Sequence, residues 1–127
     1  MMKQDAPAGA VVLVVDDDDG VRQVLRLMLE SGGYRVLEAA DGRKALEQVR
    51  SENIDVVMTD LVMPEQEGFE TIQAIRRERP SLKVIAMSGA FGGEFLHIAK
   101  LLGALSTLQK PLKVEQVLAA VADALAS

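Results

Sequence analysis

Residues 55–64 read Asp-Val-Val-Met-Thr-Asp-Leu-Val-Met-Pro. A short apolar run that ends before a proline is typical of a strand buried on both faces of a parallel sheet. Asp60 stands where this strand ends and the chain turns. A carboxylate is rarely kept at the edge of a core without a charged partner or a chemical role. The segment therefore predicts a central strand and makes Asp60 the first candidate functional residue.

The rest of the chain alternates apolar runs with segments of helical periodicity. Strands are expected over residues 11–15, 34–39, 56–60, 83–88 and 105–109. Helices are expected over residues 21–31, 43–51, 69–79, 94–102 and 114–125. In the first helix the apolar stripe predicted to face the core is Val21, Val24, Leu25, Met28 and Leu29. Gly32-Gly33 ends that helix, because glycine tolerates the left-handed conformation of a helix terminus.

A helix in every crossover predicts the α/β class, with a parallel sheet covered on both faces. The first, third and fourth strands are the most apolar and belong in the centre of the sheet, whereas the second and fifth are more polar and belong at its edges. This pattern favours a doubly wound, five-stranded (βα)5 sheet in the strand order 2-1-3-4-5, the flavodoxin-like arrangement.

Bulk properties bound the function. The 127 residues fit one domain over residues 11–127, preceded by a flexible tail over residues 1–10. A net charge of -5 argues against a direct nucleic-acid partner. The absence of cysteine excludes disulfides and, with a single histidine, an ordinary zinc site. No apolar run is long enough for a membrane span or a signal peptide, so the cytoplasm is the expected location.

Polar side chains gather at the predicted carboxyl ends of the strands, where ligands bind in such sheets. The residues are Asp16 and Asp17 after the first strand, Asp60 after the third, Ser88 after the fourth and Lys110 after the fifth. The three carboxylates are expected within about 5–6 Å of one another, where each like-charge pair costs about 3 kcal/mol. Lys110 offsets part of this cost, and a divalent cation offsets more. An all-oxygen ligand set favours Mg²⁺, which often bridges to phosphate.

These pieces together resemble the receiver domain of bacterial two-component response regulators. The resemblance covers Val11 to Leu125 and rests on Val-Val-Asp16-Asp17, Asp60-x-x-Met63-Pro64 with Gly68, Ser88, and Lys110-Pro111. Each motif is weak alone, but their order and their places at the strand ends are specific. The resemblance implies a phosphorelay protein rather than a turnover enzyme: it catalyses only its own phosphorylation and dephosphorylation.

The resemblance assigns a role to each acidic residue. Asp60 is the nucleophile that takes a phosphoryl group from a phosphohistidine of a sensor histidine kinase or a phosphotransfer protein, in a Mg²⁺-dependent reaction. Asp17 is implied to bind Mg²⁺ directly and Asp16 mainly through water. Asp60 and the main-chain carbonyl of Val62 complete the protein ligands.

The remaining implied roles concern the phosphoryl group and the switch. Lys110 pairs with the phosphoryl oxygens, and the bond from Lys110 to Pro111 is usually cis in the family. Ser88 turns its hydroxyl toward the phosphoryl group and pulls the following loop with it.

Two departures from the family pattern change the expectation. The position three residues before the lysine normally carries an aromatic ring that swings inward on activation, but here it is Thr107, so the coupling to the surface is expected to be weaker or differently built. The positions two residues after Asp60 and after Ser88 tune hydrolysis in the family. Here they are Val62 and Ala90, which cannot orient a water molecule, so a long-lived acyl phosphate is expected.

Two other functions remain open from the sequence. A degenerate receiver that serves only as an interaction module is one, because the aromatic residue is missing at Thr107. A phosphatase resembling the haloacid dehalogenase superfamily is the other, because an Asp-x-Asp-Gly pattern lies within residues 16–20. That superfamily needs a further acidic pair after the lysine, and only Glu115 and Asp123 follow here, both in the last helix.

The sequence says less about the downstream partner of the domain than about its acidic site. A downstream protein or a fused output domain is expected as a partner, and the chain is either a stand-alone receiver or part of a longer protein. The alanine-rich last helix and the family's habits make a homodimer through the fourth helix, fifth strand and fifth helix a further possibility. Asp18 or Asp19 is expected to cap the first helix, and His97 to lie on the surface.

Overall fold

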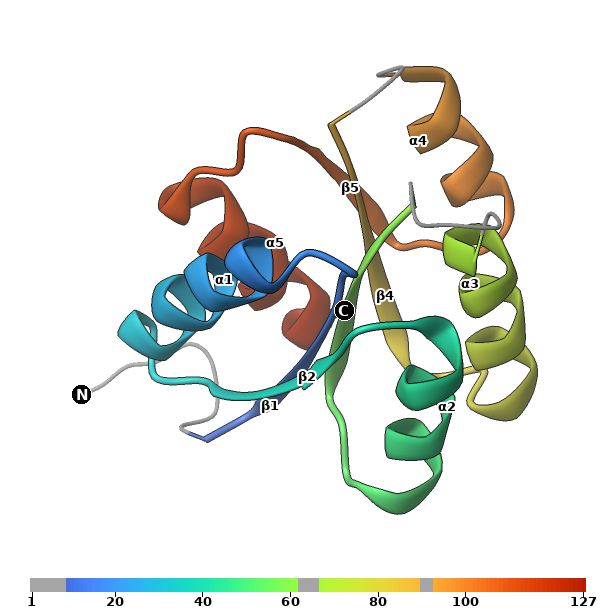
Figure 1. The fold of residues 1–127 in the computed structure, drawn as a ribbon, viewed down its shortest axis with the longest axis horizontal. Coiled ribbons are helices and arrows are strands. Elements are labelled where there is room, and N and C mark those ends of the chain that lie inside the picture. Colours follow the sequence, from blue (N-terminus) through green and yellow to red (C-terminus); the bar gives the residue numbers. More distant parts are fainter. Residues whose placement is uncertain (1–8, 62–66, 90–92) are drawn as a thin grey trace.

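The computed structural model describes residues 9–61, 67–89 and 93–127, which form one parallel sheet in the order β2-β1-β3-β4-β5 (Figure 1). The strands are β1 (Val11–Val15), β2 (Arg35–Ala39), β3 (Val56–Asp60), β4 (Lys83–Ser88) and β5 (Ser106–Gln109). The helices are α1 (Asp19–Ser31), α2 (Gly42–Ser51), α3 (Glu67–Glu78), α4 (Gly93–Leu101) and α5 (Val114–Ala126). The predicted α/β class and strand order are confirmed.

Helices cover both faces of the sheet. Helices α1 and α5 lie on one face, and α2, α3 and α4 lie on the other (Figure 1). Residues of β1 alternate between the two cores: Val12 and Val14 pack with residues of α1 and α5, while Leu13 and Val15 pack with residues of α2, α3 and α4. This alternation explains why β1 is apolar at every position, since neither face of the sheet is exposed to water there.

The burial of the strands follows the predicted order. Every residue of β3 is buried, and β1 and β4 are buried at all but their first residue. The edge strands β2 and β5 are only partly buried, and β5 has no fully buried residue. The predicted limits were within two residues: β2 and β5 begin one residue later than expected, α2 and α4 begin one residue earlier, and α1 and α3 begin two residues earlier.

One predicted core position was wrong. Val24 was expected on the buried stripe of α1, but its side chain is 50% exposed. Leu25 and Leu29, predicted on the same stripe, are fully buried. Successive residues are rotated by about 100° around a helix axis, so a stripe centred on Leu25 leaves Val24 at its margin.

Helix ends follow the expected chemistry. Asp18 caps α1, since its Oδ1 accepts hydrogen bonds from the main-chain N–H groups of Gly20 at 2.8 Å and Val21 at 3.1 Å. Asp41 caps α2 in the same way, with its Oδ1 2.8 Å from the amide nitrogen of Lys44. Gly33 has a φ of 91°, which is the left-handed conformation predicted after α1.

Two residues that precede β1, Gly9 and Ala10, already contact the domain. Gly9, within the segment predicted as a tail, donates its N–H to the Gly33 carbonyl at 3.3 Å, and Ala10 is buried. Residues 1–8 of that segment lie outside the described part. Within the part of the chain that the structure describes, no helix has the length and apolar content needed to cross a membrane.

A network of charged residues fastens α1 to the carboxyl end of β2. Glu38 of β2 accepts from the Nε atoms of Arg22 at 3.0 Å and Arg26 at 2.6 Å. Arg22 also pairs with Asp19, and Arg26 with Glu30, so the network runs along one side of α1. The hydrogen bond from Arg26, and then that from Arg22, outweigh burial and hold the pKa of Glu38 below its ordinary value.

Replacement of this carboxylate is expected to give a pH-dependent loss of stability. A carboxyl group with a lowered pKa stabilises the folded state above its ordinary pKa of about 4.3, and this contribution is lost as the pH falls through the lowered pKa. Glu38→Gln is therefore expected to reduce the free energy of unfolding at pH 7 by about 1–2 kcal/mol. The difference from wild type should vanish in urea unfolding below the lowered pKa, and a difference independent of pH would contradict the assignment.

Candidate functional site

The structure brings the predicted polar residues together at the carboxyl edge of the sheet. Asp60 is the last residue of β3 and Ser88 the last residue of β4, while Asp16 directly follows β1 and Lys110 directly follows β5. In the parallel register, Val15 of β1 lies beside Thr59 of β3. The ends of β1 and β3 are therefore level, and the carboxylates that follow meet because the strands do.

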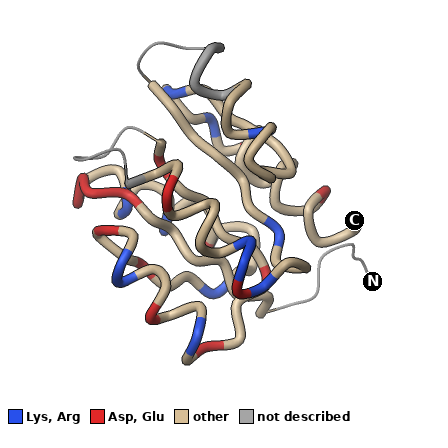
Figure 2. The backbone as a smooth tube through the Cα atoms, turned by 90° about the vertical axis from the view of Figure 1, so that its right-hand side faces the viewer, with Lys and Arg blue, Asp and Glu red and all other residues tan. Residues whose placement is uncertain are grey.

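Three carboxylates form a compact cluster. Asp16, Asp17 and Asp60 each offer an oxygen, and these oxygens lie within 4.8 Å of one another. Asp16 and Asp60 are only 1% and 4% exposed, whereas Asp17 is exposed to solvent. Figure 2 shows the acidic stretch that begins here, at residues 16–19, as a continuous red segment. The cluster thus has a buried floor and one solvent-facing carboxylate.

Lys110 compensates part of this negative charge. Its Nζ lies 3.0 Å from Oδ2 of Asp16 and 3.5 Å from Oδ2 of Asp60. Burial alone would lower the pKa of Lys110, but the hydrogen bond and charge of Asp16 and the charge of Asp60 outweigh burial and raise it. The lysine is therefore a fixed cation at neutral pH, held between two buried carboxylates.

Asp16 is held at several of its atoms. Its amide N–H donates to the Ala39 carbonyl at 3.1 Å, and its Oδ1 accepts from the Asp18 amide at 2.9 Å. Its other carboxylate oxygen accepts from Lys110. Both carboxylate oxygens of Asp16 are thus engaged within the protein.

Ser88 and Lys110 are joined through the main chain. The amide N–H of Lys110 donates to the Ser88 carbonyl at 2.9 Å, and the side chain of Ser88 is fully buried. The bond from Lys110 to Pro111 is cis, as the resemblance implied. The ends of β4 and β5 are therefore connected directly beside the cluster.

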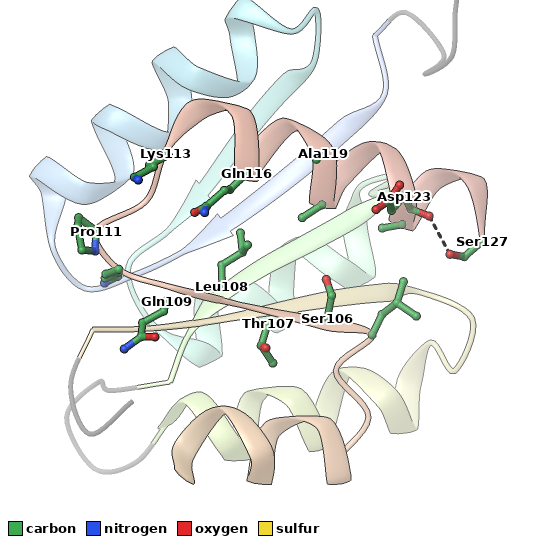
Figure 3. Close-up of a pocket in the computed structure, with 14 residues that line it drawn as sticks. Ser106, Thr107, Leu108, Gln109, Pro111, Lys113, Gln116, Ala119, Asp123 and Ser127 are labelled. Atoms are coloured by element: carbon green, nitrogen blue, oxygen red, sulfur yellow. Dashed lines mark hydrogen bonds between the residues drawn. The ribbon is translucent and has the colours of Figure 1, made fainter. Parts of the chain in front are cut away.

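Thr107 lies in β5, away from the carboxylates. Its side chain leaves the strand toward α4, on the side opposite Leu108 (Figure 3). An open groove of about 880 Å³ runs along β5 and α5, and its lining includes Thr107, Gln116 and Ala119 (Figure 3). Position 107 thus carries a threonine and no aromatic ring, as the sequence indicated. The two positions expected to tune hydrolysis, Val62 and Ala90, lie outside the described residues.

Gly68, in the first turn of α3, sets how closely that helix approaches Asp60. A Cβ atom at Gly68 would lie 2.5 Å from the main-chain oxygen of Asp60 and 2.5 Å from the Cα of Leu61. Real Cβ atoms do not approach so closely, so only glycine allows α3 to pack against the chain just after Asp60. The sequence placed Gly68 in a motif but gave no sign of this contact.

The sequence did not identify Arg22 as a neighbour of the acidic cluster. Its Nη1 donates to the main-chain carbonyl of Asp16 at 2.7 Å, and its Nε donates to Glu38. The spacing of Arg22 and Arg26 predicts two arginines on one side of a helix. The acceptor at Glu38 comes from a different strand, so spacing alone did not reveal the contact.

Comparison with known proteins agrees with this geometry. The family model for the response regulator receiver domain matches residues 12–122. The chain belongs to that family. The transcriptional regulatory protein ZraR of Escherichia coli (strain K12) is 38% identical over 115 residues, which cover 91% of this chain and 26% of ZraR.

Other relatives of this receiver domain are closer to it in length. Sporulation initiation phosphotransferase F of Bacillus subtilis (strain 168) is 31% identical over 110 residues, which cover 87% of this chain and 89% of that protein. The crystal structure of chemotaxis protein CheY4 of Vibrio cholerae matches with a TM-score of 0.86 at 33% identity, over 93% of this chain and 100% of that one. The receiver domain spans about a quarter of ZraR, so the activity of such a longer protein is not transferred to it.

A methyl group at Gly68 should disturb the receiver domain measurably. Gly68→Ala places a Cβ atom against main-chain atoms of Asp60 and Leu61. Main-chain atoms cannot move aside as the end of a flexible side chain can. We expect the free energy of unfolding to fall by about 1–3 kcal/mol in urea titrations. Gly20→Ala is the matched control, because its Cβ would meet only the Asp18 carboxylate, at 3.2 Å. Equal stability of the two variants would contradict the close approach of α3.

Proposed function

We propose that this receiver domain accepts a phosphoryl group on Asp60 from a phosphohistidine of a sensor histidine kinase or a phosphotransfer protein. The observation that carries the proposal is a carboxylate at the end of β3 that shares a cluster with Asp16 and Asp17 and lies 3.5 Å from Lys110. Family membership supports it, as does the likeness to a protein named a phosphotransferase. The protein is then a switch that modifies itself rather than a turnover enzyme.

The proposed transfer needs a nucleophile and compensation of charge. An oxygen of Asp60 forms a bond to phosphorus while the phosphorus–nitrogen bond to the donor histidine breaks. The imidazole leaves with the bonding electron pair and takes up a proton. Two anions approach each other in this step, and the ammonium group of Lys110 is placed to pair with the incoming phosphoryl oxygens. The hydroxyl of Ser88, at the end of β4, is the proposed partner of another phosphoryl oxygen.

The acidic cluster fits Mg²⁺ by the chemistry of its donors. All three side chains supply carboxylate oxygens, the ligands that Mg²⁺ prefers, and the solvent-facing Asp17 leaves room for bound water. Asp17 and Asp60 would hold the ion directly and Asp16 through water, with the carbonyl of Val62, outside the described residues, as a further ligand. When bound, Mg²⁺ neutralises charge on the carboxylates and on the phosphoryl oxygens.

We propose that the output is a change in protein contacts on the α4, β5 and α5 face. Ile98 and Leu101 of α4 and the neighbouring Leu105 are exposed apolar side chains, which supports a docking surface there. The occupant is proposed to be a downstream protein, a fused output domain or a second copy of the chain, with no direct role for nucleic acid or membrane. The proposed location is the cytoplasm.

The phosphatase alternative has an observation against it. Its Asp-x-Asp-Gly pattern spans Asp17 to Gly20, so its second acidic residue would be Asp19. The side chain of Asp19 is 92% exposed at the start of α1 and pairs with Arg22, so it lies outside the carboxylate cluster. The second alternative is a degenerate receiver that acts only as an interaction module, because Thr107 stands where the family has the aromatic residue of its switch. A phosphorylation experiment must exclude it.

Incubation with acetyl phosphate and Mg²⁺ tests the proposed acceptor. We expect mass spectrometry to show the addition of one phosphoryl group to the wild-type chain. Asp60→Asn should abolish the addition, because an amide is not a nucleophile for phosphorus. Asp41→Asn, at the cap of α2, is a matched control that should remain a substrate.

Two further measurements complete that test. Chelation of Mg²⁺ should prevent the addition, and beryllofluoride with Mg²⁺ should shift the amide signals of β4 and β5 in NMR spectra. A wild-type chain that gains no mass and shows no shift would contradict the proposal and favour the inert interaction module.

The acyl phosphate is expected to last for minutes or longer in buffer with Mg²⁺. Val62 and Ala90 offer no group that can orient an attacking water molecule. Val62→Asn keeps the main-chain carbonyl and adds such a group, so it should shorten the half-life measured by loss of the phosphorylated mass. Val24→Asn, on the exposed side of α1, should leave the half-life unchanged. A wild-type half-life of seconds would contradict the expectation.

A further inference from the structure

The guanidinium group of Arg22 connects two parts of the molecule that the proposed mechanism does not otherwise link. Its Nη1 donates to the main-chain carbonyl of Asp16 at 2.7 Å, and its Nε donates to Glu38 at 3.0 Å. Glu38 belongs to β2, the edge strand beside β1. Arg22 therefore reaches from α1 to the first residue of the acidic cluster and is itself held by the neighbouring strand.

This arginine is held more firmly than a surface ion pair. Its side chain is 13% exposed, and that of Glu38 is 28% exposed. Glu38 is fixed from two further directions: its other carboxylate oxygen accepts from Arg26 at 2.6 Å, and its main-chain carbonyl accepts from Gln48 of α2 at 2.6 Å. Because the planar guanidinium group of Arg22 is fixed in this way, it restricts the orientation of the Asp16 carbonyl to which it donates.

The group it donates to is part of the peptide unit between Asp16 and Asp17. The atoms of a peptide unit lie close to one plane, so fixing the Asp16 carbonyl also fixes the direction in which the chain continues to Asp17. Asp16 is anchored on its other side by its amide, which donates to Ala39, and by Lys110 at its carboxylate. Arg22 fixes the carbonyl end of Asp16, which leads to the solvent-exposed Asp17.

We propose that Arg22 is a positioning residue for the acidic cluster: it orients the peptide between Asp16 and Asp17 so that the carboxylates of Asp16, Asp17 and Asp60 converge on one cation. This inference rests on the proposed function, in which that cation is Mg²⁺. Arg22 would not touch the ion, because its contacts are to a main-chain carbonyl and to the carboxylates of Asp19 and Glu38.

Charge and geometry predict opposite effects, which makes the inference testable. Arg22 is a cation close to a site that binds a cation, so by charge alone its removal would tighten Mg²⁺ binding. If Arg22 positions the ligands, its removal weakens binding, as loss of an outer hydrogen-bond partner does at other metal sites. Arg22→Lys keeps the charge but loses the fork that spans the Asp16 carbonyl and Glu38, so it isolates the geometric effect.

The experiment measures the Kd of the full chain for Mg²⁺ alone by isothermal titration calorimetry. We expect Arg22→Lys to raise the Kd about 10-fold and Arg22→Met to raise it as well. Unchanged binding by Arg22→Lys together with tighter binding by Arg22→Met would overturn the inference, since charge would then be the whole effect.

Arg50→Lys is the matched control for this titration. Arg50, in the last turn of α2, pairs with Glu78 at the end of α3 through two hydrogen bonds, on the side of the sheet away from the strand carboxyl ends. The control removes a similar fork without touching the cluster, so its Kd should equal that of wild type. A Kd that rises as much for this control as for Arg22→Lys would overturn the inference.

A second measurement needs no metal. The Asp18 amide donates to Oδ1 of Asp16 at 2.9 Å, so it reports on the order of this loop. Hydrogen exchange at Asp18 should be faster in Arg22→Lys, while the amides of Leu25 and Leu29 in the middle of α1 keep their wild-type rates. A purely structural role would instead change all of α1 together, and unchanged exchange at Asp18 would overturn the inference.

The wild-type titration separates the two proposals. A wild-type chain that binds no Mg²⁺ would overturn the proposed metal site and this inference with it. A wild-type chain that binds Mg²⁺, with Arg22→Lys binding equally well, would overturn the positioning role alone.

Discussion

The ammonium group of Lys110 lies between two buried carboxylates, 3.0 Å from Asp16 and 3.5 Å from Asp60, and the site depends on this contact. Buried charges are costly unless they are paired and hydrogen bonded. One lysine cannot balance three carboxylates, and Asp17 adds its charge at the solvent side. The remaining negative charge is the physical reason to propose a divalent cation here. The same imbalance couples the stability of the fold to whatever occupies the cluster.

Parallel strand geometry brings these groups together. Asp16 and Lys110 are 94 residues apart in the chain, yet both follow strands whose carboxyl ends share one edge of the sheet. The amide of Lys110 also donates to the Ser88 carbonyl, so the end of β4 and the end of β5 are directly connected. A phosphoryl group that drew Ser88 toward Asp60 would thus act on β5 directly. This main-chain link offers a route to the surface that does not need an aromatic ring.

The edge strand β5 is less buried than the strands at the centre of the sheet. β5 has no fully buried residue, and among the described residues the Oγ of Ser106 is buried without a hydrogen-bond partner. Thr107 leaves the outer face of this strand without a large ring, beside a groove shared with α5. β5 is thus the least buried strand of the sheet. The proposed phosphoryl acceptor therefore lies at the buried acidic end of the sheet, and the proposed output surface includes its least buried strand.

The sequence by itself determined the order of the strands and the convergence of Asp16, Asp60 and Lys110, because two-sided burial and parallel direction follow from local patterns. The roles of these residues stay proposals, because position does not measure reactivity. Only the tertiary structure decided that Arg22 meets Glu38 and the Asp16 carbonyl. That contact depends on the rotation of α1 about its axis and on its distance from β2. Packing of the whole core sets both, and no local spacing in the sequence specifies them.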